Sequence, residues 1–132
     1  MNKFDLEERL INFAVQIVEI CESMPDTRAS NHLSGQLIRS GTSPALNYGE
    51  AQSGESRKDF IHKIKIVLKE LRETFVCLKI IHRSSLYKNE EKIKIAINEN
   101  NELISIFVKS AETAQKNLPV KYRNQTSKIK NH

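Results

Sequence analysis

Glycine and proline are scarce in this chain, which holds four and three of them in 132 residues. Good helix formers dominate, and strand-like alternation of apolar and polar residues is nearly missing. No run of 18 apolar residues occurs, so a transmembrane helix is not expected. The sequence therefore predicts one all-α domain, long enough to bury roughly two-thirds of its unfolded surface.

Cysteine is also rare, and tryptophan is absent. Cys21 and Cys77 each fall within an apolar helical pattern, which is typical of a small buried side chain rather than half of a disulfide. The N-terminal segment MNKFDLEERL carries acidic residues where a signal peptide would be apolar. These features predict a cytoplasmic protein with no membrane association.

Apolar residues recur with a period of 3.6 residues in four segments. The first two span about 4–23 and 29–53; Ser56 is expected to cap the third, and Asn89 the fourth, which Pro119 ends. Short connections between long helices favour antiparallel neighbours. We therefore expect an up-down-up-down four-helix bundle over residues 1–118 and a basic, flexible tail over 119–132.

The second helix is interrupted in sequence by Gly41 and Pro44. Proline removes one backbone hydrogen bond and clashes with the carbonyl four residues earlier, which predicts a kink near Gly41–Pro44. Ser43 can alternatively cap a new helix with Pro44 at its first position, giving a broken helix.

A row of small and polar residues follows one side of this helix. We name as the polar seam the residues Arg39, Ser43, Asn47, Glu50 and, on the third helix, Glu73. One interpretation is a ligand pocket or acid–base site around Asn47 and Glu50. The favoured interpretation is a buried polar network in which Arg39 reaches Glu73, because no histidine or cysteine lies within a turn and one carboxylate makes a poor catalytic site.

Charge is distributed unevenly along the chain. Residues 1–56 hold 4 basic and 8 acidic residues, whereas residues 57–94 hold 11 basic and 5 acidic residues. After Glu112 the chain carries five basic residues and no acidic one. The positive charge is thus concentrated in the third helix, the turn that follows it and the tail.

One face of the third helix is almost entirely cationic over about 37 Å. We call this face the basic ridge, formed by Lys58, His62, Lys65, Lys69, Arg72, Val76, Lys79 and Arg83. A cationic stripe of this kind is typical of contact with a phosphate backbone. The candidate nucleic-acid-binding residues are Lys58, Lys65, Lys69, Arg72, Lys79 and Arg83.

Two other interpretations of the basic ridge stay open: a solvated face, or a face that meets the acidic first helix of a neighbouring subunit. Aromatic side chains do not interleave with the ridge, so neither base stacking nor sequence-specific recognition is indicated.

Several apolar residues lie away from the core-facing stripe of their helices. Contiguous exposed apolar patches usually mark interfaces, so these residues predict self-association. The candidate interface residues are Val15, Leu46, Ile66 and Ile80.

Recognisable catalytic chemistry is missing from the sequence. The four histidines lack metal-ligand spacing, and there is no phosphate-binding loop, dinucleotide fingerprint or nucleophile elbow. We expect no enzymatic activity, no metal and no cofactor.

The segment QLIRSGTSPALNYGEAQSGESRKDF, followed by LKELRET, resembles the bacterial four-helix bundle protein family, also called the 23S rRNA intervening-sequence protein family. The chain departs from the family pattern at Leu46 and Gly49, where alanine is usual. The matching residues are Gln36, Leu37, Arg39, Ser43, Asn47, Glu50, Phe60 and Glu73.

This resemblance implies a small bundle that assembles into ring-like homopentamers and is encoded within inserts in rRNA genes. A related fold is that of the accessory protein of diversity-generating retroelements, a basic pentamer that associates with reverse transcriptase and nucleic acid. We therefore expect a non-enzymatic oligomer that binds RNA or DNA. The alternative is a protein–protein scaffold or accessory subunit, for example of a reverse transcriptase, without direct nucleic-acid binding.

Overall fold

The computed structural model describes residues 2–53 and 56–119, and this part of the chain contains four α-helices and no strand. The helices are α1 (Lys3–Glu22), α2 (Arg28–Gln52), α3 (Arg57–Arg83) and α4 (Glu90–Lys116). The predicted all-α four-helix bundle is confirmed, and the bounds of α1 and α2 differ from the expected ones by one residue.

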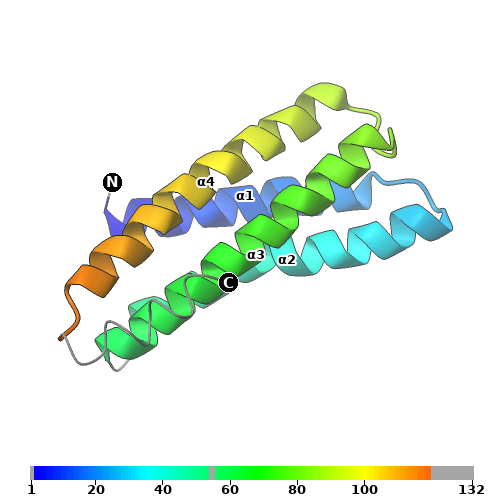
Figure 1. The fold of residues 1–132 in the computed structure, drawn as a ribbon. Helices are drawn as coiled ribbons and strands as arrows, with labels where there is room; N and C mark the ends of the chain where they lie inside the picture. The colour runs from blue at the N-terminus through cyan, green and yellow to red at the C-terminus, as the bar shows by residue number, and fades with distance from the viewer. Residues whose placement is uncertain (1, 54–55, 120–132) are drawn as a thin grey trace.

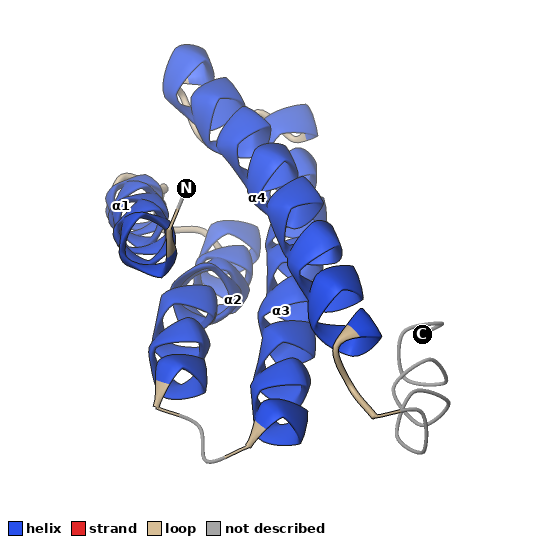
Figure 2. Ribbon diagram, turned by 90° about the vertical axis from the view of Figure 1, so that its left-hand side faces the viewer, coloured by secondary structure: helices blue, strands red, loops and turns tan. Residues whose placement is uncertain are grey.

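Successive helices run in opposite directions, joined by short connections at alternate ends of the bundle (Figure 1). Viewed toward the helix ends, α1 and α3 stand on opposite sides, with α2 between them (Figure 2). Helix α2 packs against both α1 and α3, α3 packs against α4, and α1 touches α4 much less. Consequently α1 and α3 turn their outer faces in different directions.

Each helix begins at a polar side chain that accepts a hydrogen bond from a backbone N–H three residues later. Such a cap satisfies one of the backbone donors that the first turn leaves unpaired. The distances are 3.1 Å at Ser56 and 3.0 Å at Asn89, the two caps predicted from sequence. The other two caps are Asn2 and Thr27.

Helix α2 is continuous through Gly41 and Pro44, so the broken-helix alternative is wrong. Gly41 lies where α1 approaches most closely: a Cβ atom placed there would lie 2.7 Å from both Cγ1 and Cγ2 of Ile17. Only a residue without a side chain allows this approach. The glycine thus serves packing between α1 and α2.

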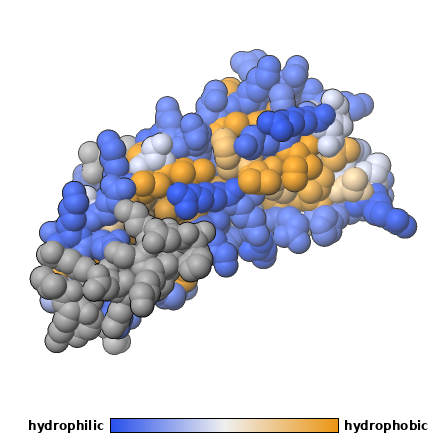
Figure 3. All heavy atoms as spheres, in the orientation of Figure 1, coloured by the Kyte–Doolittle hydropathy of each residue, from blue (hydrophilic) through white to orange (hydrophobic). Residues whose placement is uncertain are grey.

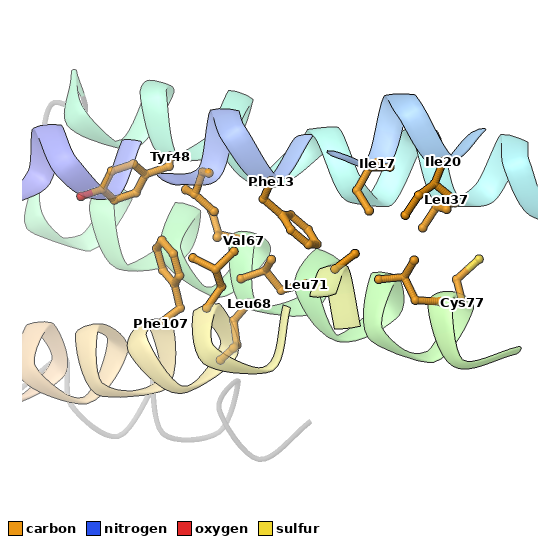
Figure 4. Packing of buried hydrophobic residues seen from close by; sticks show 14 of the residues in the cluster. Phe13, Ile17, Ile20, Leu37, Tyr48, Val67, Leu68, Leu71, Cys77 and Phe107 are labelled. Atoms are coloured by element: carbon orange, nitrogen blue, oxygen red, sulfur yellow. The ribbon is translucent and has the colours of Figure 1, made fainter. Parts of the chain in front are cut away.

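The core contains the stripes that the sequence periodicity predicts on all four helices. Tyr48 and Phe107 meet edge to face, with ring centroids 5.5 Å apart, and Phe13 and Leu71 fill the centre of the bundle (Figure 4). Burial of such side chains supplies the main stabilisation of the bundle.

Helix α3 buries a wider arc than one stripe because it packs against two helices. Cys77 is buried, as its apolar helical pattern predicts, and its thiol donates to the carbonyl of Leu33 at 3.6 Å. Ile61, Leu68 and Ile81 are also buried. Helix α3 is thus enclosed on two sides, toward α2 at Cys77 and toward α4 at Ile61.

The bundle ends at Leu118, which is buried against Ile61 and Ala114. The predicted tail, from residue 120 onward, lies outside the described residues, so its flexibility stays a prediction. Within the described part, no helix is both long enough and apolar enough to span a membrane.

Candidate nucleic-acid interface

The basic ridge lies on the outer face of α3. Residues three and four apart share one face of a helix, so the ridge forms a single line of side chains opposite the core stripe. Most members are exposed, and Lys65 and Lys79 are half-buried. The side chains predicted to contact nucleic acid are thus presented together on the surface of the single chain.

Much of the ridge's charge is not neutralised within the protein. Within residues 2–53 and 56–119, Lys69, Arg72 and Arg83 make no ion pair, while Lys79 lies over the Phe75 ring at 4.3 Å. A cation above an aromatic face keeps its charge. The C-terminal half of α3 therefore projects a positive potential.

The carboxylates of α3 point away from the ridge. Arg39 on α2 forms an ion pair with Glu70 at 3.0 Å and another with Glu73. These carboxylates raise the pKa of Arg39, chiefly through the hydrogen bond with Glu73. Arg39 thereby engages two of the three acidic residues of α3 and leaves the ridge cationic.

The polar seam lies at the surface between α2 and α3, contrary to the buried network expected from sequence. The Arg39 side chain is 51% exposed, and Glu50 pairs with Lys63 at 2.5 Å. Asn47 stays within its own helix, where its Nδ2 donates to the carbonyl of Ser43 at 3.0 Å and to the hydroxyl at 2.9 Å. The seam is a set of separate contacts: the ion pairs of Arg39 and Glu50 join α2 to α3, and the hydrogen bonds of Asn47 stay within α2.

A buried polar contact does exist one helical turn from the seam, between Ser40 and Thr74. Their hydroxyl oxygens lie 2.9 Å apart, and both side chains are fully buried. Thr74 also donates to the carbonyl of Glu70 at 2.8 Å. Sequence analysis missed this pair, although Ser40 lies between Arg39 and Ser43 of the polar seam.

An apolar groove lies on the outside of the bundle between α1 and α2. We call it the α1/α2 groove; it has a volume of about 320 Å³. Two of the predicted interface residues, Val15 and Leu46, line it, and they are 50% and 68% exposed. The remaining lining residues are Ile11, Ala14, Val18, Glu19, Thr42 and Ala45.

The other two predicted interface residues lie on α3. Ile80 is exposed beside Val76, whereas Ile66 is half-buried. Hydrophobic surface gathers over the C-terminal half of α3 in Figure 3, with hydrophilic side chains beside it. Exposed apolar residues thus occur on both α1/α2 and α3.

Titratable groups of the described residues form no cluster of three or more histidine, cysteine, aspartate or glutamate side chains that can hold a metal ion. Burial raises the pKa of the Cys21 thiol to about 11, which keeps it protonated and weakly nucleophilic at neutral pH. Burial raises the pKa of Cys77 as well. The arrangement is suited to binding through charge and apolar contact rather than to catalysis by these thiols.

A family model, described as 23S rRNA-intervening sequence protein, matches residues 2–109. The chain belongs to this family. The match includes the polar seam, the α1/α2 groove and the whole basic ridge.

A solved structure supports the same assignment. The crystal structure of a protein of unknown function from the S23 ribosomal protein family of Bacteroides thetaiotaomicron superposes with a TM-score of 0.76 and 29% sequence identity. The similarity covers 85% of this chain and 99% of that chain. No functionally curated protein matches the sequence.

Proposed function

We propose that this family member is a non-enzymatic, homo-oligomeric accessory protein that binds RNA or DNA without sequence specificity through the basic ridge. The observation that carries the proposal is a line of exposed cations on α3, of which Lys69, Arg72 and Arg83 make no ion pair within the described part of the chain. Two of the three acidic residues of the same helix, Glu70 and Glu73, pair with Arg39 on α2.

Phosphate backbones attract such a surface because each cation that meets a phosphate releases condensed counterions. The ridge offers six lysine or arginine side chains along α3 and few groups that read base edges. Binding by this surface is therefore electrostatic, tolerant of sequence and strongly dependent on salt.

Self-association is supported by the exposed apolar residues on α1/α2 and α3. The family resemblance supplies the subunit number, a pentamer. An oligomer carries one basic ridge per copy. When several linked ridges bind the same nucleic-acid strand, the overall affinity exceeds that of a single copy.

The test is a titration of the protein with RNA and with DNA across salt concentrations. Replacing Lys65, Lys69 and Arg72 together by glutamine is expected to weaken binding to every sequence. It should also lower the slope of log K against log salt by roughly two to three, since each phosphate contact contributes about 0.9 on duplex DNA and about 0.7 on single strands.

A matched control removes the same charge elsewhere, at Lys92, Lys94 and Lys109 on the exposed part of α4. The slope should change little in this variant. Equal affinities for the ridge variant and the unmodified protein would refute the assignment of the ridge.

The second candidate, a protein–protein scaffold or an accessory subunit such as that of a reverse transcriptase, is favoured by the exposed α1/α2 groove. Co-purification of a partner that survives nuclease treatment, combined with no nucleic-acid binding by the pure protein, would support this candidate over the first.

A further inference from the structure

The α1/α2 groove has an acidic surround. On α1, Val15 at the groove is preceded by Glu8 seven residues earlier and followed by Glu19 and Glu22, four and seven residues later. All three glutamates are exposed, and within the described residues none of them makes an ion pair. The groove is thus an apolar hollow flanked by uncompensated negative charge.

The C-terminal half of α3 carries the opposite pattern. Val76 is 53% exposed and continues into the exposed Ile80. Lys69 and Arg83 stand seven residues before and after Val76, with Arg72 between Lys69 and Val76. Because seven residues span about 10.5 Å of helix, the cations around Val76 have the same spacing as the glutamates around Val15.

When Val76 of one copy is placed opposite Val15 of another, the cations on either side of Val76 come to lie opposite the glutamates on either side of Val15. A parallel crossing sets Lys69 against Glu8, and an antiparallel crossing sets Lys69 against Glu22. In both orientations a glutamate of α1 faces a cation of α3 at each end of the contact. The complementarity therefore does not depend on the direction in which the two helices cross.

Other pairings of the exposed apolar faces are worse. Two grooves facing each other would oppose glutamate with glutamate, and like charges across an interface are destabilising. The exposed Ile95 on α4 has Lys92 and Glu91 one turn before it and Glu99 one turn after it, so its face is mixed in charge and attracts the groove's glutamates less than α3 does. Among the exposed apolar faces of α1–α4, that of α3 is the cationic one.

We propose that the α1/α2 groove of one copy receives the face around Val76 and Ile80 on α3 of a second copy, in a head-to-tail contact. This inference rests on the self-association included in the proposed function and names the two surfaces that form it. The contact is heterologous, because each copy contributes a different patch, and such contacts close into rings when the rotation between copies allows it.

The size of the molecule is compatible with this contact. A standard protein interface buries about 800 Å² on each partner. That is about a tenth of the 8085 Å² accessible surface of the chain. Each copy can therefore present both patches at once without crowding.

Mixing two variants provides the test. Val15→Asp disables the groove and Val76→Asp disables the α3 patch; both residues are about half exposed, so folding should persist, as circular dichroism would verify. In light scattering at micromolar concentration each variant alone should be monomeric. An equimolar mixture should form a dimer of twice the monomer mass, because one intact groove remains for one intact patch.

Two results would overturn the head-to-tail contact: an unchanged oligomer in both single variants, or single variants that are monomeric and stay so when mixed. Charge reversal provides a second measurement. Glu8→Lys with Glu22→Lys should weaken assembly at least tenfold, and adding Lys69→Glu with Arg83→Glu to the same chain should restore it. If no such restoration occurs, the contact is wrong.

The failures of the two proposals are distinguishable. If the unmodified protein is monomeric but still binds RNA with a steep salt dependence, self-association is refuted and the binding role of the basic ridge is supported. If the unmodified protein is an oligomer but the two variants do not pair when mixed, self-association is supported. Only the assignment of the contact to the α1/α2 groove and the α3 face is then refuted.

Discussion

Single residues decide how closely α1 can approach α2, and Gly41 is the clearest case. The space for a Cβ atom at this position is occupied by the side chain of Ile17, which is fully buried. Close-packed interiors do not absorb an added methyl group without shifts. Glycine is therefore needed at position 41 because the Ile17 side chain fills the space for a Cβ atom, and not because of the backbone conformation.

Gly41→Ala is expected to destabilise the protein by about 1–3 kcal/mol, since the added methyl group forces Ile17 or the helix backbone to move. Chemical denaturation should measure the loss. Gly35→Ala is the matched control on the same helix, because a Cβ atom there meets nothing within 4 Å. That control should stabilise the helix by up to about 1 kcal/mol; a loss in both variants would contradict the steric explanation.

At the scale of helices, α2 and α3 are joined by contacts of two kinds. Arg39 and Glu50 make ion pairs at the surface, which contribute little because water and salt screen them. Ser40 and Thr74 form a fully buried contact, where an unpaired hydroxyl is costly. The buried pair therefore specifies the packing of α2 on α3 more strongly than the exposed ion pairs.

Thr74→Val should cost about 1–3 kcal/mol of folding free energy, because it leaves the Ser40 hydroxyl buried without its partner. Ser40→Ala combined with Thr74→Val should cost less than the sum of the two single changes. A double-mutant cycle by denaturant unfolding measures this coupling. Additive costs would show that the two hydroxyl groups contribute independently.

The elements were predictable from sequence because each carries its own local signals. The caps at Ser56 and Asn89 and the core stripes follow from patterns within one helix, and the structure agrees with them. The burial of Cys77 follows from its apolar helical pattern. The Ser40–Thr74 contact was not predictable, because it depends on how far α3 rotates toward α2. The pairing of Arg39 with Glu73 was predicted correctly. The burial of the seam was predicted wrongly, because the exposure of its side chains also depends on how α3 is rotated against α2.

At the scale of the whole molecule, the two proposals share part of one surface. A second copy seated on Val76 and Ile80 covers the region of Arg72, Lys79 and Arg83, while Lys58 and Lys65 stay outside this contact. The two proposals together therefore imply that nucleic acid and a neighbouring copy compete for the C-terminal half of the basic ridge.

This competition predicts a different salt dependence for the monomer. Val15→Asp disables the groove, so that no second copy covers Lys69, Arg72 and Arg83 in any chain. Its log K against log salt should be steeper per chain than that of the assembled protein, by about 0.9 for each additional phosphate contact on duplex DNA. Fluorescence anisotropy with a short duplex measures the slope, and identical slopes would argue against a shared surface.

Helix α1 carries five acidic and two basic residues, whereas α3 carries eight basic and three acidic residues. Since these helices stand on opposite sides of the bundle (Figure 2), the molecule has a permanent electric dipole perpendicular to its long axis. A polyanion at low ionic strength exerts a torque on this dipole within a Debye length of about 10 Å at 0.1 M salt. In the proposed binding, this torque is expected to turn α3 toward the nucleic acid before the two molecules touch.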